Sequence, residues 1–216
     1  MAIPIESAKT SKKLKKTPEG SSIQIPKLEI QTFKMTLVGQ TPLMVQKFSE
    51  KAKRMIEDKQ AKKAKTARAA RDPVAEYEAS LYVIDAKKEI YGVPVSGLKN
   101  CCVSACGFIE GVFKTTARGA FHILCEPHGL IPITKGEPIM DTRTVRLSGP
   151  GRPADLRYRA RFDTWELTFM VQYNKNVISP EQILNLFENA GFSIGLCEYR
   201  PEKNGNFGMF KVKRNE

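Results

Sequence analysis

The chain has 216 residues, 41% of them hydrophobic, and a formal net charge of +12 at pH 7. A chain of this length can bury a full core, and no window approaches the roughly 18 consecutive apolar residues of a membrane helix. The N-terminus lacks the apolar segment of a secretory signal, so we expect a cytoplasmic protein without membrane association. Three of the five cysteines lie within residues 101–106, which argues against a disulfide framework.

The positive charge is concentrated in three segments. Lys and Arg outnumber Asp and Glu by 5 to 2 in residues 1–20, by 10 to 3 in residues 47–71 and by 6 to 1 in residues 143–161. The remainder of the chain is therefore slightly acidic. Such patterning favours a polyanionic partner, with nucleic acid as the leading candidate, although solvated surface charge is the simpler alternative.

The first part of the chain combines a tail, a strand and a basic segment. Residues 1–27 are polar and lysine-rich, which predicts a disordered basic arm. Residues 28–216 are expected to form a single domain, in which alternating apolar residues over 28–39 predict the first strand. Residues 47–80 predict a basic helical insertion that breaks at Asp72-Pro73, and their few large apolar side chains predict that its first half projects from the body.

The next segments predict two short strands around a turn at residues 85–88 and then a helix with Ser96 as its N-cap. The buried face of this helix is predicted to hold Leu98, Cys101, Cys102, Ala105, Phe108 and Ile109. Because the cysteines fall on this apolar face, we interpret them as core residues. His122 and His128 supply no second paired-ligand motif, so neither a metal nor a cofactor is expected.

The segments "AFHILCEP" (120–127) and "LIPI" (130–133) are strand-like. Residues 136–156, interrupted by Gly and Pro, predict a second insertion, a protruding loop or hairpin. After it, a period of two predicts a strand with Arg157, Arg159 and Arg161 on one face and Tyr158 and Phe162 on the other. Residues 165–174 alternate cleanly and predict a strand with one buried face in an antiparallel sheet.

The last helix is predicted over residues 179–191, with Ser179 and Gln182 forming a capping box and Gly191 as the C-cap. Strands over 192–199 and 207–212 then flank a glycine-rich loop. The predicted fold class is α+β: a ferredoxin-like or RRM-like antiparallel sheet with two core helices and the two insertions.

Two segments resemble a known family. "YGVPVSGLKN" (91–100) resembles the "IPGSSLKG" element of the RAMP superfamily of CRISPR systems, in which a strand runs into a helix whose N-terminus faces bound RNA. "GFSIGLCEYRPEKNGNFGMFKV" (191–212) resembles the superfamily's C-terminal glycine-rich signature. The resemblance implies a RAMP-like domain that binds single-stranded nucleic acid, alone or with other complex subunits. A phage-encoded protein acting on single-stranded DNA or RNA fits the same features.

A protein that follows a phosphate backbone needs cations in a row and groups that receive bases. We expect Lys99 beside Ser96, the arginines 157, 159 and 161, and Arg200 with Lys203 to provide them. Gly195, Gly205 and Gly208 would let the backbone of the last loop approach a phosphate. The basic segments add Lys47, Lys51, Arg54, Arg143 and Arg146. Two simpler interpretations stay open: an edge strand protected by charge, and an ordinary Asn204-Gly205 hairpin turn.

The sequence therefore predicts a non-enzymatic protein that binds single-stranded RNA or DNA and assembles into a homo-oligomer or filament along it. One alternative is a metal-independent endoribonuclease, as in some RAMP proteins, with His122 as general base near Tyr158. Another is a structural or inhibitory protein whose basic face binds an acidic protein.

Overall fold

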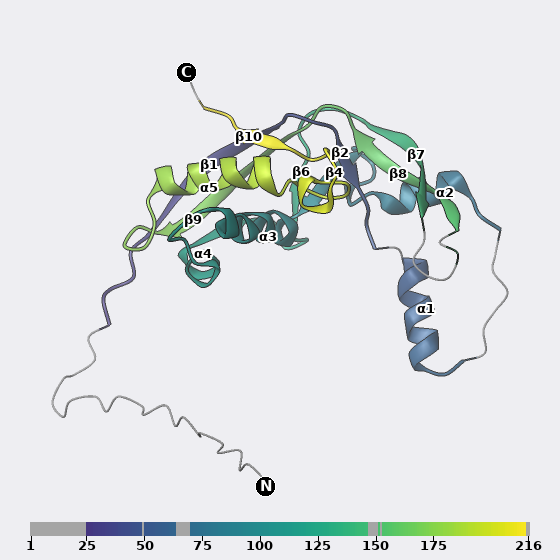
Figure 1. Cartoon of the computed structure of the whole chain (residues 1–216), viewed down its shortest axis with the longest axis horizontal. Coiled ribbons are helices and arrows are strands. Elements are labelled where there is room, and N and C mark those ends of the chain that lie inside the picture. The colour runs from purple at the N-terminus through teal and green to yellow at the C-terminus, as the bar shows by residue number, and fades with distance from the viewer. Residues whose placement is uncertain (1–24, 49, 64–69, 147–150, 152, 215–216) are drawn as a thin grey trace, which may run out of the picture.

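The computed structural model describes residues 25–48, 50–63, 70–146, 151 and 153–214. The predicted basic arm, residues 1–27, lies almost wholly outside this range. Figure 1 shows a sheet lined by helices at one end of the molecule, and a long hairpin with a separate helix at the other. No helix within the described ranges is long and apolar enough to cross a bilayer.

The body is a four-stranded antiparallel sheet. Its strands are, in spatial order, β10 (Phe210–Val212), β1 (Ile30–Gly39), β9 (Glu166–Asn174) and β5 (Phe121–Leu124). Helix α3 (Val95–Ala105) lies in the chain between β1 and β5, and helix α5 (Pro180–Ser193) lies between β9 and β10. This βαββαβ order with antiparallel neighbours is the ferredoxin-like arrangement, so the predicted α+β fold class is confirmed.

The core lies between this sheet and the two helices. Strand β9 alternates as predicted, with Leu167 and Phe169 buried and Met170 exposed. Phe187 of α5 packs against Phe121 of β5 and against Phe169, with ring centroids 5.9 and 5.8 Å apart. The apolar faces of sheet and helices are thus buried against each other.

Helix α5 starts as predicted and ends differently. Ser179 and Gln182 form the predicted capping box. Gly191, however, is a buried residue inside the helix, because β10 passes so close that a Cβ there would lie 2.0 Å from the Phe210 carbonyl oxygen. The helix continues to Ser193 and the chain turns at Gly195, so the predicted strand over 192–199 does not form and the last strand is shorter than predicted.

Helix α3 begins at Val95 with Pro94 at the N-cap position, so the prediction of Ser96 as N-cap was wrong. The Val95 amide donates instead to the Gly129 carbonyl at 3.0 Å, an acceptor from a distant loop. The three clustered cysteines are buried, which confirms their core assignment. A 3₁₀ turn, Cys106–Phe108, ends the helix early and leaves Phe108 66% exposed rather than buried.

Short elements complete the body. The two predicted short strands are β3 (Val83–Asp85) and β4 (Ile90–Pro94), and β6 (Leu130–Pro132) completes their sheet. Helix α4 (Lys114–Ala120) was not predicted, because seven residues with only two buried alanines give no apolar period.

The far end of the molecule is built on a second sheet of order β2-β8-β7. Strands β7 (Pro138–Arg146) and β8 (Ala154–Phe162) pair residue by residue, and β2 (Leu43–Val45) joins the base of β8. The predicted loop or hairpin is therefore a long hairpin, and Gly149 and Pro150 between its strands lie outside the described residues. Helix α2 (Pro73–Ser80) packs on β8, where the Ala160 amide donates to the Ser80 hydroxyl at 2.8 Å.

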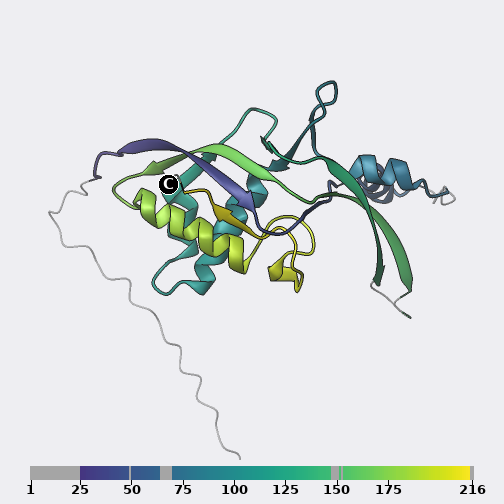
Figure 2. The same ribbon diagram turned by 90° about the horizontal axis from the view of Figure 1, so that it is seen from above.

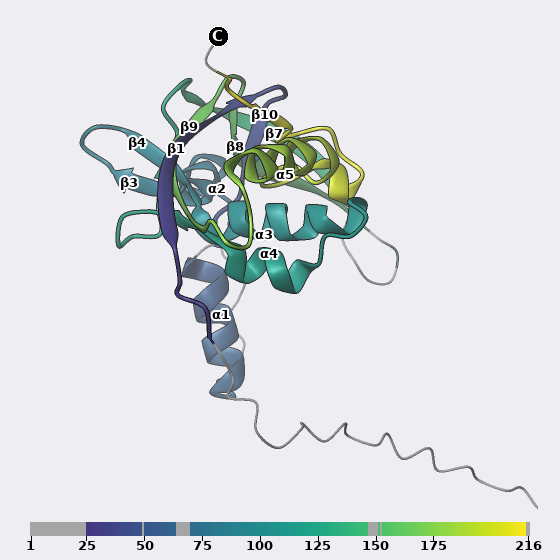
Figure 3. The same cartoon turned by 90° about the vertical axis from the view of Figure 1, so that its left-hand side faces the viewer.

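The predicted helical insertion contains α1 (Glu50–Gln60), which projects from the body in Figures 1 and 3. Figure 2 places α1 and the hairpin at the same end. In the part of the chain that the structure describes, no hydrogen bond or ion pair joins α1 to another element. The chain on either side is anchored, because the Lys47 amide donates to the Ser80 carbonyl at 2.8 Å and Arg71 pairs with Asp155.

Candidate nucleic-acid interface

The arginine row lies on one face of the long hairpin. The unbroken β7–β8 register places Arg157, Arg159 and Arg161 on one face of β8 and Tyr158 and Phe162 on the other, as predicted. The second face is the one that α2 covers, where Ala160 and Phe162 are buried. The arginines thus line the face that α2 leaves uncovered.

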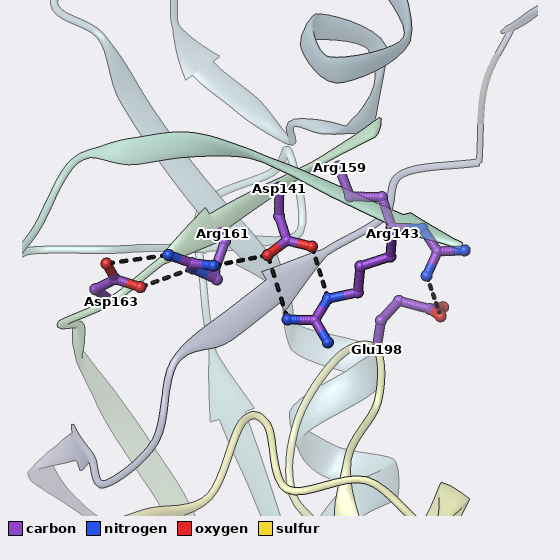
Figure 4. Close-up of polar contacts among 6 residues, drawn as sticks. All are labelled: Asp141, Arg143, Arg159, Arg161, Asp163 and Glu198. Atoms are coloured by element: carbon purple, nitrogen blue, oxygen red, sulfur yellow. Dashed lines mark hydrogen bonds and ion pairs between the residues drawn. The ribbon is translucent and has the colours of Figure 1, made fainter. Parts of the chain in front are cut away.

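Each of these arginines is already paired with a carboxylate, as Figure 4 shows for two of them. The ion pairs are Arg157 with Asp155 at 3.2 Å, Arg159 with Glu198 at 3.2 Å, and Arg161 with Asp141 and with Asp163 at 2.7 Å each. The row is therefore a charge-balanced network, which the sequence pattern of three alternating arginines did not reveal.

Arg143 extends the network from β7. Its Nε donates to Asp141 at 2.6 Å, and its guanidinium lies over the ring of Phe207 at 4.6 Å from the centroid. Burial alone would raise the pKa of Asp141, but hydrogen bonds from Arg143 and Arg161 hold that pKa below its usual value. Asp141 therefore stays charged and orients both guanidinium groups.

The same arginines fasten the C-terminal loop to the hairpin. Arg143 and Arg159 each lie over the Tyr199 ring at 5.5 Å, and Arg159 also pairs with Glu198. The Glu198 amide donates to the Met44 carbonyl at 3.0 Å, which ties the loop to strand β2. The hairpin face and the last loop thus form one continuous surface.

The three loop glycines permit close crossings of the chain. A Cβ at Gly205 would lie 1.7 Å from the Tyr199 carbonyl oxygen, and a Cβ at Gly208 would lie 2.0 Å from the Leu196 carbonyl oxygen. Gly195 and Gly208 also adopt φ of +72° and +68°. All three amides donate to carbonyls of the chain, at 2.9, 3.1 and 2.8 Å for Gly195, Gly205 and Gly208. These contacts explain the glycines by tight turns and close crossings of the chain, but the predicted Asn204-Gly205 hairpin was wrong, because no strand forms over 192–199 and β10 pairs with β1.

The other two cations of the loop differ from each other. Arg200 pairs with Glu202 at 2.6 Å and donates to the Cys197 carbonyl at 2.8 Å. Lys203 is exposed, and no ion pair involves it within the described ranges. Lys203 is therefore the more accessible of the two to an anion.

Lys99 does not point its amine at solvent beside the start of α3. Its Nζ donates to the Ala117 carbonyl at 2.8 Å and to the Phe121 carbonyl at 2.5 Å, and it lies 3.4 Å from the Phe121 ring centroid. Burial lowers the pKa of Lys99 to about 8. Lys99 thus satisfies carbonyls at the C-terminal end of α4, which corrects the expectation of an exposed cation.

The two family-like segments meet at one pocket of about 300 Å³. Gly97, Asn100 and Ser104 of α3 form one wall, and loop residues that include Gly195, Glu198 and Arg200 form another. The segments are about 100 residues apart in the sequence and side by side in the structure. Ser96 is exposed in the first turn of α3.

Further cations lie on the inserted segment and at the end of the hairpin. Arg54 on α1 and Arg146 at the end of β7 are exposed, and no ion pair involves Lys47, Arg54 or Arg146 within the described residues. Lys51 lies on α1, but its side chain falls outside what the structure describes. Lys47, Arg54 and Arg146, unlike the arginine row, are therefore without a paired carboxylate in the described residues.

The structure does not bring His122 and Tyr158 together. His122 lies on β5 of the body sheet, opposite Gln172, whereas Tyr158 lies on β8 of the other sheet. No hydrogen bond joins them among the described residues. In the same ranges, no three His, Cys, Asp or Glu side chains are grouped so as to hold a metal ion.

Sequence reasoning missed the partners of the arginines. Asp141, Asp163 and Glu198 were not singled out, nor were the rings of Tyr199 and Phe207. The spacing of Asp141 and Arg143, two residues apart, is a signal of a strand, whereas the neighbouring Gly and Pro residues predict only a loop or hairpin over 136–156.

No protein-family model and no curated protein matches the sequence. Among solved structures, the crystal structure of Cmr6 from Pyrococcus furiosus is similar, with a TM-score of 0.40 and 10% sequence identity. The similarity covers 87% of this chain and 100% of that chain.

Proposed function

We propose that the protein is a non-enzymatic binder of single-stranded nucleic acid that contacts the phosphate backbone through the end of the molecule carrying α1 and the hairpin. The observation that carries the proposal is the inserted segment, residues 47–71, which contains 10 Lys and Arg against 3 Asp and Glu and whose helix α1 is bonded to no other described element. A basic segment whose helix adds no residue to the core is explained by binding to an external polyanion.

Exposed apolar side chains on the same segment support a single strand over a duplex. Phe48, Met55 and Ile56 are 53%, 65% and 48% exposed. The faces of bases in a single strand are accessible to such side chains, whereas a duplex covers them by stacking. The pocket shared by the two family-like segments, with Lys203 nearby in sequence, offers a second place where the strand contacts the body.

Binding is tested by fluorescence anisotropy with labelled single-stranded RNA, single-stranded DNA and a matched duplex. We expect both single strands to bind more tightly than the duplex, with affinity falling steeply between roughly 50 and 200 mM salt because counterions are released. Replacing Lys47, Arg54 and Lys59 by Ala should weaken binding by at least about tenfold, since each phosphate contact contributes electrostatically.

A matched control removes the same number of charges elsewhere. Lys87, Lys88 and Lys135 are exposed residues outside the inserted segment, and their triple Ala variant should bind nearly as well as the wild type. Equal losses in the two triple variants would mean that only net charge matters. A flat salt titration of the wild type would exclude backbone binding altogether.

The non-enzymatic assignment and the assembly are tested with the same strands. Labelled RNA and DNA should remain intact after prolonged incubation with and without magnesium. Particle size should increase stepwise with strand length if copies assemble along the strand, and a constant monomer size would exclude a filament.

A further inference from the structure

The carboxylates around the arginine row fall into two groups by exposure. The side chains of Asp141 and Asp155 are 7% and 15% exposed, whereas those of Glu198 and Asp163 are 43% and 56% exposed. The first pair is enclosed by protein on most sides. The second pair lies at the solvent boundary, so each of these carboxylates can rotate away from its arginine into water.

The two exposed carboxylates also make replaceable contacts. Arg159 is 16% exposed and meets Glu198 at 3.2 Å, longer than the roughly 2.8 Å of a strong charge-assisted hydrogen bond. The Arg159 Nε is buried without a hydrogen-bond partner within the described residues. Arg161 has two partners, so the buried Asp141 would still hold it at 2.7 Å if Asp163 moved away.

We propose that Glu198 and Asp163 occupy the positions of two backbone phosphates, and that a bound single strand displaces both side chains. Arg159 and Arg161 stand two residues apart on one strand face, roughly 7 Å from each other. Asp141 acts as a positioning residue, since it orients Arg143 and Arg161 toward the ligand. This proposal rests on the proposed function, because it assigns particular contacts to the same ligand.

The arrangement selects for a polyanion. A free phosphate or a mononucleotide can replace one carboxylate at a time, and the internal carboxylate competes at high effective concentration. A strand presents linked phosphates to both positions, so the second exchange becomes intramolecular. The loop need not leave its place, because the Glu198 amide keeps its bond to the Met44 carbonyl while the side chain rotates.

The test compares single substitutions that each remove one negative charge. Glu198→Gln should bind a labelled single strand roughly two- to fivefold more tightly than the wild type, which corresponds to the usual strength of an exposed ion pair. Asp163→Asn should show a gain of the same sign. The control is Glu110→Gln, an exposed residue outside the network that makes no ion pair within the described ranges, and it should change affinity less.

Asp141→Asn separates this proposal from a general charge effect. It also removes one negative charge, yet it should weaken binding, because Arg143 and Arg161 lose the group that orients them. Thermal melting of each variant shows whether the fold is intact. In an Arg159→Met background, Glu198→Gln should no longer increase affinity.

Equal or weaker binding by Glu198→Gln relative to Glu110→Gln, with the melting temperature unchanged, would overturn the proposal and leave the proposed function standing. Weaker binding with a lower melting temperature would also overturn it, since Glu198 would then only fasten the loop. If the wild type binds no strand at low salt, the proposed function itself fails. Inorganic phosphate and a mononucleotide serve as competitors, and either one displacing the strand at micromolar concentration contradicts selection for a polyanion.

Discussion

The two ends of the molecule use apolar residues in opposite ways. In the body, Phe121, Leu167 and Phe187 are completely buried between the sheet and its helices. At the other end, Phe48, Met55 and Ile56 stand exposed among cations on the inserted segment. Under the proposed function, stability and ligand contact are spatially separated: the body contains the buried core, and the far end is free to carry charge.

The largest expected effect comes from the body. Phe187→Ala should lower the free energy of unfolding by about 3–5 kcal/mol, because it removes a ring packed between two others. Met55→Ala on α1 should change it by less than about 0.5 kcal/mol. Urea denaturation measures both, and comparable losses would show that α1 packs on the body in solution.

A second pair of variants compares the two family-like segments. Gly208→Ala should cost on the order of 2 kcal/mol, since the left-handed backbone and the Leu196 carbonyl leave no room for a Cβ. Gly97→Ala should stabilise α3 by roughly 0.5–1 kcal/mol, because no atom lies within 4 Å of its Cβ position and Ala favours a helix. If both substitutions prove neutral, the chain at Gly208 does not lie this close to the Leu196 carbonyl in solution.

The sharpest test of the separation is to remove the inserted helix. Replacing residues 48–70 by a flexible Gly-Ser linker should leave the melting temperature within a few degrees, because the bonds of Lys47 and Arg71 to the rest of the fold remain. Affinity for a single strand should fall at least about tenfold. If the deletion unfolds the protein, the inserted helix also contributes to the stability of the fold.

The remaining prediction concerns the pH dependence that Lys99 gives to stability. Burial lowers its pKa to about 8 from the ordinary value of 10.5, so the unfolded chain binds the extra proton between these two pH values. Stability of the wild type relative to Lys99→Met should therefore rise as pH increases from about 8 toward 10.5. Chemical denaturation at pH 7.5 and 9.5 measures this difference, and a constant difference would mean that the amine is solvated.

Much of the body could be predicted from local patterns. The alternation over 165–174 and the capping box at Ser179 act within a few residues, and the structure confirms both. The end of α5 could not be predicted in this way. Gly191 looked like a C-cap, but it is required by the close approach of β10, a contact between segments about 20 residues apart.

The sequence predicts which cations belong to the candidate site, but it does not predict the carboxylates that pair with them. The face of the three arginines on β8 followed from a period of two. The ion pairs that neutralise these arginines could not be predicted in this way, because Glu198 lies in the C-terminal loop and Asp141 lies on strand β7. Lys99 shows the same limit, since its position on α3 was predicted while the direction of its amine depends on the carbonyls of α4, a helix too short to be recognised.

The double anchorage of the inserted segment also has a consequence for protein engineering. On one side of α1 the Lys47 amide bonds to α2, and on the other side the Arg71 side chain pairs with α2 and β8, so the chain leaves and re-enters the fold at fixed positions. The region between these two anchor points is therefore a site where the inserted segment can be replaced. Foreign helices, reporter modules or sensors of other ligands could be exchanged there without redesigning the scaffold beneath.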